Sequence, residues 1–394
     1  MSIRLLLLVC LLAGFPRLAP AQTVDPTFAI IGFTPTGTVF DVKVQSNGKI
    51  VVAGGFNEVG GVARPGIARL NADGTLDTTF VPPFTSGESY AIVLQPPDKI
   101  IAAGLFVGSG LNGWAVVRLN ADGSHDTTYA GAAGSSERVL TMKAASADRV
   151  VAAGSFSSLA GSARSKIARL NANGGADPGF VPATITNQII RIAVQSDDKV
   201  IIGGDFSAIG STLLTRLARL DAAGALDPGF TPPADGFGNG MINTALALRG
   251  DGALWVGAQG TIACGGIDAV CLRRLLGTGA SDPSWTTLAF NISAQVSAIL
   301  PLTDNGALIG GAFTSVGGNP RTALARVSAA GAVDPAFGIN ISWSGAAPAQ
   351  ILAMTLQPDG KLLIAGQFDN VGGMSTPLLA RLDLPDLLFR DGFE

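Results

Sequence analysis

The sequence repeats itself along almost its whole length, and this repetition limits the possible folds more than any single motif. An apolar run that ends in Gly-x-Phe returns every 50 to 55 residues. Six copies carry the phenylalanine, namely Phe56, Phe106, Phe156, Phe206, Phe313 and Phe368. A seventh, degenerate copy runs from Trp255 to Gln259, with Gln259 expected at the aromatic position. Repetition at this period indicates an array of similar supersecondary units, none of which can bury its apolar face alone.

Each repeat unit contains short apolar segments separated by turn signals, without helical periodicity. In the first unit we expect strands near 38–45, 49–56, 66–71 and 75–80. Four short strands in a unit of this size are typical of a β-propeller blade. Most blades are covered on both faces by neighbouring blades, which explains the continuous apolar runs and the low share of charged residues, 14%. Small residues such as Gly54 are expected where neighbouring sheets converge.

An arginine and an aspartate recur at a fixed spacing in the second half of the units. Asp77 lies eight residues after Arg69, and five later units repeat this spacing. Arg381, in the last unit, has no such aspartate after it, whereas Asp25 stands alone near the start. A closed ring explains both observations, so we expect Arg381 to pair with Asp25 and residues 23–30 to form the outer strand of the last blade. Because each arginine has its own carboxylate, structural ion pairs are favoured over an anion-binding ring of arginines.

These patterns predict an all-β fold, a seven-bladed β-propeller of four-stranded antiparallel blades, closed by the N-terminal strand pairing into the last blade. We expect a signal peptide at 1–21, the propeller at 22–383 and a C-terminal tail at 384–394. The repeat units are expected at about 29–80, 81–129, 130–180, 181–230, 231–285, 286–337, and 338–383 together with 23–28.

The first residues have the features of an export signal. Arg4 precedes an apolar run from Leu5 to Phe15, about eleven residues, which is too short to cross a bilayer as a helix. Ala19-Pro20-Ala21 then supplies the small-x-small cleavage pattern. We therefore expect an exported protein that is monomeric, not membrane-embedded, and located in the periplasm, at the cell surface or outside the cell.

Cys264 and Cys271 are the cysteines that remain after the expected cleavage, and an oxidising compartment favours a disulfide between them. A metal site is the weaker alternative, because two cysteines without a nearby histidine supply too few ligands. Both cysteines fall in the unit with the degenerate repeat. We interpret this unit as a decayed blade repaired by a disulfide, and a specialised binding site is the alternative.

Composition and motifs exclude several classes of function. With 26 basic and 29 acidic residues, the chain offers no electrostatic footprint for nucleic acid. The single histidine, His125, excludes a histidine-rich metal centre within one chain. The turn Asn71-Ala72-Asp73-Gly74 lacks the acidic ligands of a calcium loop and is interpreted as a tight turn. We find no nucleophile elbow or phosphate loop, and we predict no catalytic residue, cofactor or metal.

The connectors between units vary most in sequence, and variable loops on a rigid scaffold commonly carry binding sites. Four residues in these connectors are candidate ligand-binding residues, namely Phe84, Asp235, Phe237 and Trp343. Aromatic rings beside a carboxylate would suit a sugar or a peptide. The alternative is that these rings fill gaps between blades.

The stretch Leu-Asn-Ala-Asp-Gly-Thr-Leu-Asp-Thr-Thr-Phe at 70–80, together with Leu-Gln-Pro-Asp-Gly-Lys-Leu-Leu-Ile-Ala-Gly-Gln-Phe at 356–368, resembles the delta-60 repeat of exported bacterial proteins. The resemblance covers residues 23 to about 383 and implies a β-propeller-like fold without naming a substrate. Three functions stay open: a non-catalytic binding or interaction module for a protein or glycan, a carbohydrate-active enzyme with carboxylates on the connector face, and a structural component of the cell envelope.

Overall fold

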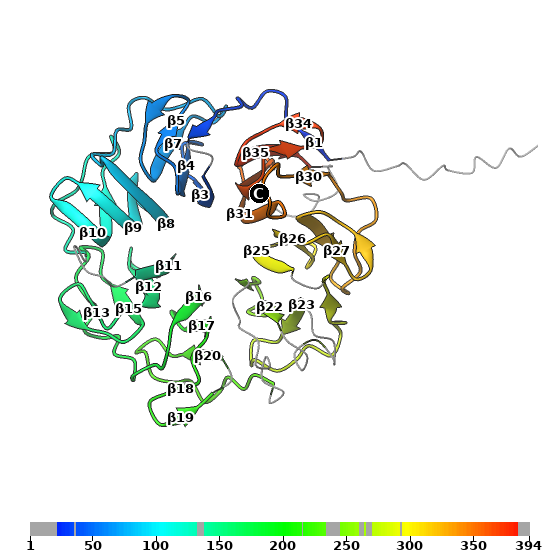
Figure 1. The fold of residues 1–394 in the computed structure, drawn as a ribbon. Helices are drawn as coiled ribbons and strands as arrows, with labels where there is room; N and C mark the ends of the chain where they lie inside the picture. The colour runs from blue at the N-terminus through cyan, green and yellow to red at the C-terminus, as the bar shows by residue number, and fades with distance from the viewer. Residues whose placement is uncertain are drawn as a thin grey trace, which may run out of the picture.

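The computed structural model describes residues 22–34, 37–131, 138–214, 216–233, 245–259, 264, 270–291 and 294–384. Within these ranges the chain is all-β, and no helix has the length and apolar character needed to cross a membrane. Figure 1 shows sheets arranged around a central space, with the chain running round it from the blue to the red end. The expected signal peptide at 1–21 and residues 385–394 of the expected tail lie outside the described residues.

Seven larger antiparallel sheets contain most of the described strands and are numbered here in chain order. The first three are β3 (Val39–Val44), β4 (Ile50–Gly54) and β7 (Ile67–Leu70); β8 (Ser86–Gln95), β9 (Lys99–Gly108) and β10 (Leu111–Leu119); and β11 (Arg138–Ala144), β12 (Val150–Ser155) and β15 (Ile167–Leu170). The fourth and fifth are β16 (Ile189–Val194), β17 (Val200–Gly204) and β20 (Leu217–Leu220); and β21 (Leu246–Leu248), β22 (Leu254–Gln259), β23 (Val270–Leu275) and β24 (Leu288–Ala289). The sixth and seventh are β25 (Gln295–Pro301), β26 (Ala307–Ala312) and β29 (Leu324–Val327); and β31 (Gln350–Leu356), β32 (Leu362–Gln367), β35 (Leu379–Asp383) and β1 (Thr23–Val24).

Small sheets of two-residue strands lie beside five of these larger sheets and were not expected from the sequence. Their strands are β2 (Phe33–Thr34), β5 (Glu58–Val59) and β6 (Val62–Ala63); β13 (Ser158–Leu159) and β14 (Ser162–Ala163); β18 (Ala208–Ile209) and β19 (Thr212–Leu213); β27 (Ser315–Val316) and β28 (Asn319–Pro320); and β30 (Ile341–Ser342), β33 (Asn370–Val371) and β34 (Met374–Ser375). Several hairpins turn at a glycine pair with positive φ, such as Gly60 and Gly61, a conformation that glycine adopts readily.

The core lies between neighbouring sheets, and β4 shows why its residues are apolar without alternation. Ile50 and Val52 belong to one cluster of buried side chains, which includes Leu363 on β32 of the seventh sheet. Val51 and Ala53 point the other way and belong to a cluster shared with the second sheet. Successive side chains of a strand point to opposite faces, so a strand covered on both faces is apolar at every position.

The expected four-stranded blades are observed in the fifth and seventh sheets, and the other five larger sheets of the described residues have three strands. In the first unit the fourth segment makes a single bridge, Leu70 to Leu76, and then turns. The Oδ1 atom of Asp77 accepts hydrogen bonds from the amide nitrogen of Thr79 (3.0 Å) and from its hydroxyl (2.6 Å). Phe80 donates its amide to the carbonyl of Asp77 at 3.3 Å. An aspartate that bonds its own following backbone favours a turn over an extended strand, so the expectation of a strand at 75–80 is wrong.

The N-terminal segment pairs with the last strand of the chain. Thr23 lies opposite Asp383 and Val24 opposite Leu382, which places β1 at the outer edge of the seventh sheet. The amide of Asp25 also donates to the carbonyl of Arg381 at 2.9 Å. The regular strand covers only two residues of the expected 23–30, because Asp25 begins a turn like the one at Asp77.

Strand register changes the alignment of the fifth unit. Gly257 lies opposite Leu272, just as Ala53 lies opposite Ile67 in the first unit. Residue 258 therefore corresponds to Gly54, and the position of the repeated aromatic falls on residue 260, outside the described residues. The expectation that Gln259 occupies the aromatic position is wrong by one residue. The glycine of this run, Gly257, aligns with Ala53 and therefore lies one position before the position of Gly54.

Candidate functional site

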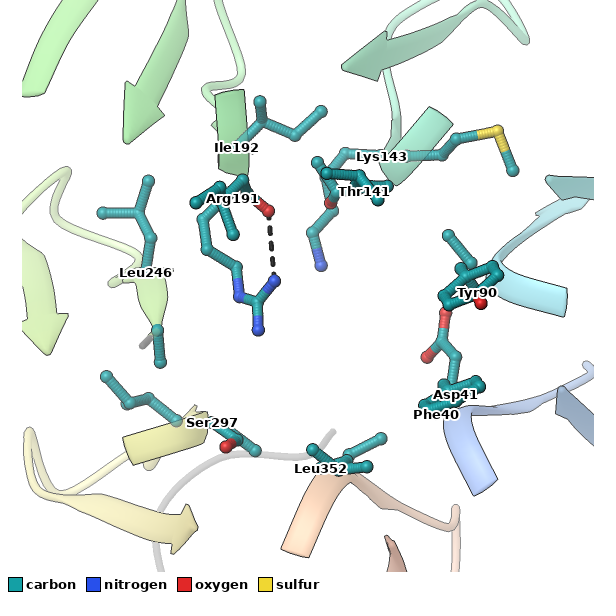
Figure 2. Close-up of a pocket in the computed structure, with 18 of the residues that line it drawn as sticks. Phe40, Asp41, Tyr90, Thr141, Lys143, Arg191, Ile192, Leu246, Ser297 and Leu352 are labelled. Atoms are coloured by element: carbon teal, nitrogen blue, oxygen red, sulfur yellow. Dashed lines mark hydrogen bonds between the residues drawn. The ribbon is translucent and has the colours of Figure 1, made fainter. Parts of the chain in front are cut away.

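A cavity of about 350 Å³ lies at the centre of the arrangement of sheets. Its walls come from the first strand of each larger sheet, namely β3, β8, β11, β16, β21, β25 and β31. In Figure 1 the labelled strands β3, β8, β11, β16, β25 and β31 lie nearest the central space. Figure 2 shows side chains from these different strands converging on it. Small-molecule sites commonly have volumes of about 300–1,000 Å³, so this cavity is large enough for a small ligand.

A β-bulge in the inner strand directs one side chain into the cavity in six of the sheets. Val39 pairs with Gly54 and Asp41 with Ala53, which leaves Phe40 between them without a partner. The same shift in the other sheets leaves out Tyr90, Leu140, Ile190, Ser297 and Leu352. All six of these bulged residues line the cavity. Bulges bend a strand and change the direction of a side chain, so they account for the composition of the cavity wall.

The glycine of the repeated Gly-x-Phe motif makes room for the bulge. A Cβ atom at Gly54 would lie 2.1 Å from the carbonyl oxygen of Thr38, which is closer than real atoms approach. The equivalent glycines of five other sheets would meet an inner-strand carbonyl at 1.9–2.4 Å, namely Gly104, Gly154, Gly204, Gly311 and Gly366. The expectation that Gly54 fits against a neighbouring sheet is therefore wrong, because the close contact lies within its own sheet.

Three cations and one carboxylate line the described part of the cavity. The carboxylate, Asp41, forms an ion pair with Lys43. Its Oδ2 atom accepts a hydrogen bond from the amide of Ile92 at 3.0 Å, and its Oδ1 atom accepts one from the amide of Val42 at 2.9 Å. The charge of Asp41 is therefore engaged within its own strand and with the neighbouring sheet. Lys143 and Arg191 are the other two cations of the described lining.

These two side chains, Lys143 on β11 and Arg191 on β16, reach toward the middle of the cavity from adjacent sheets (Figure 2). Lys143 is exposed to the cavity interior and makes no hydrogen bond or ion pair with the described residues. Confinement in the cavity, with the charges of Lys43 and Arg191 nearby, lowers the pKa of Lys143 to about 8, and Asp41 offsets part of this effect. Arg191 donates from Nη1 to the carbonyl of Ile190 at 3.1 Å, and burial lowers its pKa.

Aromatic rings extend from the cavity toward its rim. Phe40 and Tyr90 stack with ring centroids 5.0 Å apart, and Tyr90 lies 5.5 Å from the ring of Trp114. The guanidinium of Arg138 covers Trp114 at 4.8 Å. Burial and a hydrogen bond to Glu88 raise the pKa of Tyr90 to about 12, so this hydroxyl stays neutral and donates to Glu88 at 2.5 Å. The rings themselves are neutral, and they are held in place by stacking and by contacts with Arg138 and Glu88.

The two described residues among those proposed from the connectors, Phe84 and Trp343, lie outside the lining of this cavity. Phe84 is buried and stacks on Phe106 with centroids 4.5 Å apart, as a residue that fills the core would. Trp343 is half-buried and packs against the clusters of the first and seventh sheets. Neither lines the central cavity. Asp235 and Phe237 lie outside the described residues.

The recurring arginines hold the sheets together. Arg69 donates from Nε to Asp77 Oδ2 at 2.7 Å, and its guanidinium lies 4.7 Å from the centre of the Phe80 ring. Arg381 makes the same contact with Asp25 at 2.7 Å. Several of these arginines also donate from Nη1 to a turn carbonyl of the next sheet: Arg381 to Ala72 (2.6 Å), Arg118 to Ala172 (2.7 Å), Arg169 to Ala222 (2.8 Å) and Arg219 to Gly277 (2.6 Å). Their hydrogen bonds are directed into the fold, which argues against an anion-binding ring.

The paired aspartates are held in the ionised form. Burial alone would raise the pKa of Asp77, but hydrogen bonds from Lys49, Thr79 and Arg69 outweigh burial and hold the pKa well below its ordinary value. The same balance lowers the pKa of Asp25 and Asp126. These shifts follow from structural pairing and do not mark catalytic acids.

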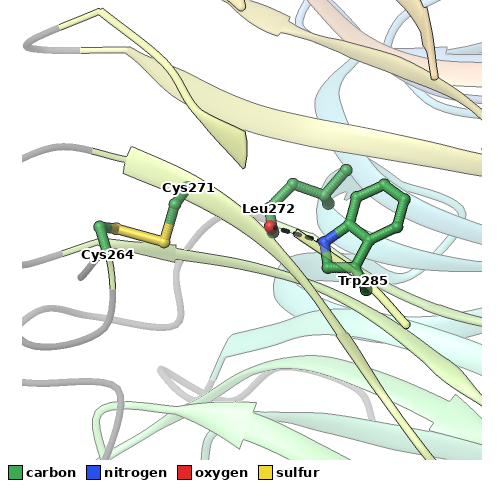
Figure 3. Close-up of a disulfide and its surroundings, with 4 residues drawn as sticks. All are labelled: Cys264, Cys271, Leu272 and Trp285. Atoms are coloured by element: carbon green, nitrogen blue, oxygen red, sulfur yellow. Dashed lines mark hydrogen bonds between the residues drawn. A yellow bond between two sulfur atoms is a disulfide. The ribbon is translucent and has the colours of Figure 1, made fainter. Parts of the chain in front are cut away.

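Cys264 and Cys271 form a disulfide with their Cα atoms 5.6 Å apart (Figure 3). Cys271 lies on β23 of the fifth sheet, and both cysteines are buried in the cluster that the fifth sheet shares with Ile201 and Leu217 of the fourth. Trp285 donates from its indole nitrogen to the carbonyl of Leu272 at 3.3 Å. The described part of the chain contains no group of three or more histidine, cysteine, aspartate or glutamate side chains able to hold a metal ion.

Sequence reasoning did not identify the residues of the cavity. The bulged positions have no residue type common to all six sheets. Lys143 recurs only as Lys43 at the equivalent position of the first sheet. One signal was present: each bulged residue lies fourteen positions before the glycine of the motif, as Phe40 does before Gly54. Glycine inside a strand often marks a bulge, and a bulge re-aims its side chain.

A family model described as "Domain of unknown function (DUF5122) beta-propeller" matches slightly more than half of the chain. The matched residues are 45–80, 95–129, 147–180, 195–230, 305–337 and 357–386. The fifth unit, in which the repeat is degenerate, has no match. No curated protein matches the chain in sequence.

Solved structures of other proteins share the fold, and two of them cover more than nine tenths of this chain. The extracellular domain of a hybrid two-component system from B. thetaiotaomicron has a TM-score of 0.56 and 11% sequence identity, covering 91% of this chain and 39% of that one. The chain thus spans about two fifths of the length of that structure. Virginiamycin B lyase from Staphylococcus aureus has a TM-score of 0.55 and 12% identity, covering 92% of this chain and 99% of that one. At these identities the likeness shows a common fold.

Proposed function

The chain belongs to the DUF5122 β-propeller family, and we propose that it is a binding module that holds a small ligand in the central cavity. The observation that carries the proposal is the set of bulges, through which six sheets each direct one side chain into the same cavity. The distortion interrupts regular pairing in each of these six sheets, and at functional sites such bulges serve to aim side chains.

We propose further that the sheets are the seven blades of one closed propeller, with the unit boundaries expected above, and that the chain is an exported bacterial protein of the delta-60 repeat type. The pairing of β1 with β35 supports closure, as does the buried cluster that contains Phe28 of the N-terminal segment together with Leu363. The Cys264–Cys271 disulfide supports export, because disulfides persist in oxidising compartments.

Binding is favoured over the carbohydrate-active enzyme by the carboxylates of the described residues. Glycosidases commonly place two carboxyl groups about 5–10 Å apart across the scissile bond. Asp41 is the one carboxylate that lines the described part of the central cavity, and Glu88 lines a separate cavity of about 310 Å³. Asp41 is also held by Lys43 and by two backbone amides, which leaves it poorly placed to exchange a proton.

Filling the cavity tests the proposal. In Ser297→Phe and Leu352→Phe, singly and combined, a bulged side chain becomes the residue that Phe40 already supplies at the equivalent position of the first sheet. The matched control, Ala121→Phe, adds the same ring to an exposed turn far from the cavity lining. A metabolite and oligosaccharide library is screened by ligand-observed NMR against the wild type and these variants.

We expect compounds that bind the wild type to lose at least about tenfold in affinity in the filled variants and to keep it in Ala121→Phe. Compounds that bind all variants equally would place the site elsewhere and refute the cavity as the ligand site. A complete lack of binders would favour the structural envelope component, and turnover of a bound sugar would favour the enzyme.

A further inference from the structure

We propose that the central cavity recognises an organic anion, with a carboxylate or phosphate group held by Lys143 and Arg191 and an apolar body packed against the bulged side chains. This inference rests on the proposed function, in which the cavity is the ligand site, and adds the chemistry of the ligand. The elements that carry it are β11 and β16, which are adjacent in the ring and supply both cations.

The positive charge of the cavity is local. The whole chain has a formal net charge of −3, yet the described cavity lining carries Lys43, Lys143 and Arg191 against Asp41 alone. Besides the pair of Asp41 and Lys43, the described lining carries two further cationic side chains, Lys143 and Arg191. A cleft lined by one sign of charge, with low-dielectric walls, concentrates ligands of the opposite sign.

No hydrogen bond or ion pair with the described residues explains the charge of Lys143. Lys49, Lys99, Lys199 and Lys361 each pair with an aspartate of the repeated motif. Lys143 makes no such contact with the described residues and extends into the cavity. Confining an ammonium group without a partner disfavours folding, and such groups are commonly retained for binding or catalysis.

The geometry of the same two strands suits a ligand with one charged end. Leu140 and Ile190 are the bulged residues of β11 and β16, and both line the cavity together with Phe40. A molecule whose anionic group meets the two cations can therefore place an apolar body against these side chains. Guanidinium and ammonium groups bind carboxylates and phosphates through charge-assisted hydrogen bonds, which are stronger than neutral ones.

Titratable groups face Lys143 from several strands. They are Asp41 and Lys43 on β3, Tyr90 on β8 and Arg191 on β16. The cavity residues described on β21, β25 and β31 carry no ionisable side chain. Tyr90 is neutral near pH 8, and Asp41 is engaged by Lys43, so Lys143 is the group whose charge changes just above neutral pH.

Isothermal titration calorimetry in a low-chloride buffer tests the inference with four probes: benzoate, phenyl phosphate, the neutral isostere benzamide, and inorganic phosphate. Benzoate and phenyl phosphate distinguish the two anionic groups. The variants are Lys143→Met, Arg191→Gln and the charge-keeping Lys143→Arg. The control is Lys199→Met, which removes one positive charge near Asp227, away from the cavity lining.

We expect one of the two organic anions to bind at least about tenfold more tightly than benzamide, because a hydrogen bond to a charged group is worth about that factor or more. Lys143→Met and Arg191→Gln should each lower the affinity by about tenfold, whereas Lys143→Arg and Lys199→Met should retain it. Affinity should also fall as the pH rises from 7 to 10, and this dependence should be much weaker in Lys143→Met.

Equal binding of benzamide and benzoate would overturn the inference, as would equal losses in Lys143→Met and Lys199→Met. Inorganic phosphate that binds as tightly as phenyl phosphate would refute the apolar part of the ligand. If none of the probes binds, the inference that the ligand is an organic anion is wrong. Library compounds that lose affinity in Ser297→Phe would still support the cavity as the binding site. If Lys143→Met does not fold, Lys143→Gln replaces it.

Discussion

Asp25 and Arg381 lie 356 residues apart in the sequence and form an ion pair with 2.7 Å between Oδ2 and Nε. Both side chains are buried, and the guanidinium also covers the ring of Phe28 at 4.6 Å. Asp77 and Arg69 make the same contact within a single unit. Asp25 and Arg381 make it between the two ends of the described chain.

Removing the carboxylate of Asp25 should destabilise the whole protein. In Asp25→Asn, Arg381 loses the charge that compensates it, and Lys361 keeps its ion pair with Asp383 alone. Breaking a buried pair in this way costs about 3–5 kcal/mol. The urea midpoint should fall, by about as much as in Asp77→Asn. The control Asp197→Asn, at an exposed carboxylate, should change stability by less than about 1 kcal/mol. If Asp25→Asn were as stable as the wild type, contacts between the chain ends would not contribute to stability.

A methyl group at Gly54 should disturb the first sheet. In Gly54→Ala the new Cβ atom would lie 2.1 Å from the carbonyl oxygen of Thr38, so the bulge must shift. Forcing extra atoms into a packed site typically costs about 1–3 kcal/mol, which thermal unfolding would detect. Gly32→Ala is the control, since no atom lies within 4 Å of the added methyl. Similar melting temperatures for the two variants would contradict the steric role of Gly54.

Acid should unfold the protein through its paired aspartates. The pKa values of Asp25, Asp77 and Asp126 are lower in the folded protein than their ordinary value of 3.8. Their ionised forms therefore contribute stability that is fully present above about pH 4 and is lost as the pH falls toward the folded-state pKa values. Urea titrations from pH 7 to pH 2 should show a midpoint that declines below pH 4, less steeply in Asp77→Asn. A constant midpoint down to pH 2 would exclude this linkage.

The disulfide should affect stability and leave the cavity unchanged. The sequence separation of Cys264 and Cys271 is 7, and closing a loop of this size contributes about 2.5 kcal/mol in the chain-entropy model. The double variant Cys264→Ser with Cys271→Ser should melt at a lower temperature while binding any cavity ligand with wild-type affinity. Lost affinity at unchanged stability would instead assign the fifth unit to a binding site.

Lys143→Met should fold at least as stably as the wild type at pH 7. The pKa of Lys143 is lowered from 10.5 to about 8, so between these values the unfolded chain binds more protons than the folded one. The charged lysine thus disfavours the folded state below pH 8, and wild-type stability should rise relative to that of the variant from pH 8 to pH 10. Differential scanning calorimetry at pH 7 and pH 10 measures both. A clear loss of stability in Lys143→Met at pH 7 would reveal a structural role for the lysine.

The repeat made much of the fold predictable, because its signals are local. Apolar residues at every position of β4 follow from two covered faces, and the spacing of Arg69 and Asp77 follows from one hairpin. The fourth segment was misjudged for a local reason as well. The side chain of Asp77 bonds its own backbone and turns the chain, which a pattern of apolar residues does not reveal.

The cavity could not be predicted from residue types. A bulge is a property of two paired strands, and its place depends on register, which the sequence does not state. Phe40, Leu140 and Ser297 occupy the same structural position with different chemistry. Lys143 stands out only once the structure shows that it forms no ion pair with the described residues, unlike the lysines near the recurring arginines. Phe84 was predicted to bind a ligand because it is an aromatic residue in a connector, but its side chain is buried.

The bulged position separates two kinds of change in this repeat. Substitution there alters what a molecule meets on entering the middle of the protein, while the ion pairs that join one sheet to the next stay as they are. Each repeat unit can therefore change its bulged residue by a single substitution while the contacts between neighbouring sheets are preserved. A lineage of such proteins could acquire new partners through a handful of point changes on an otherwise constant framework.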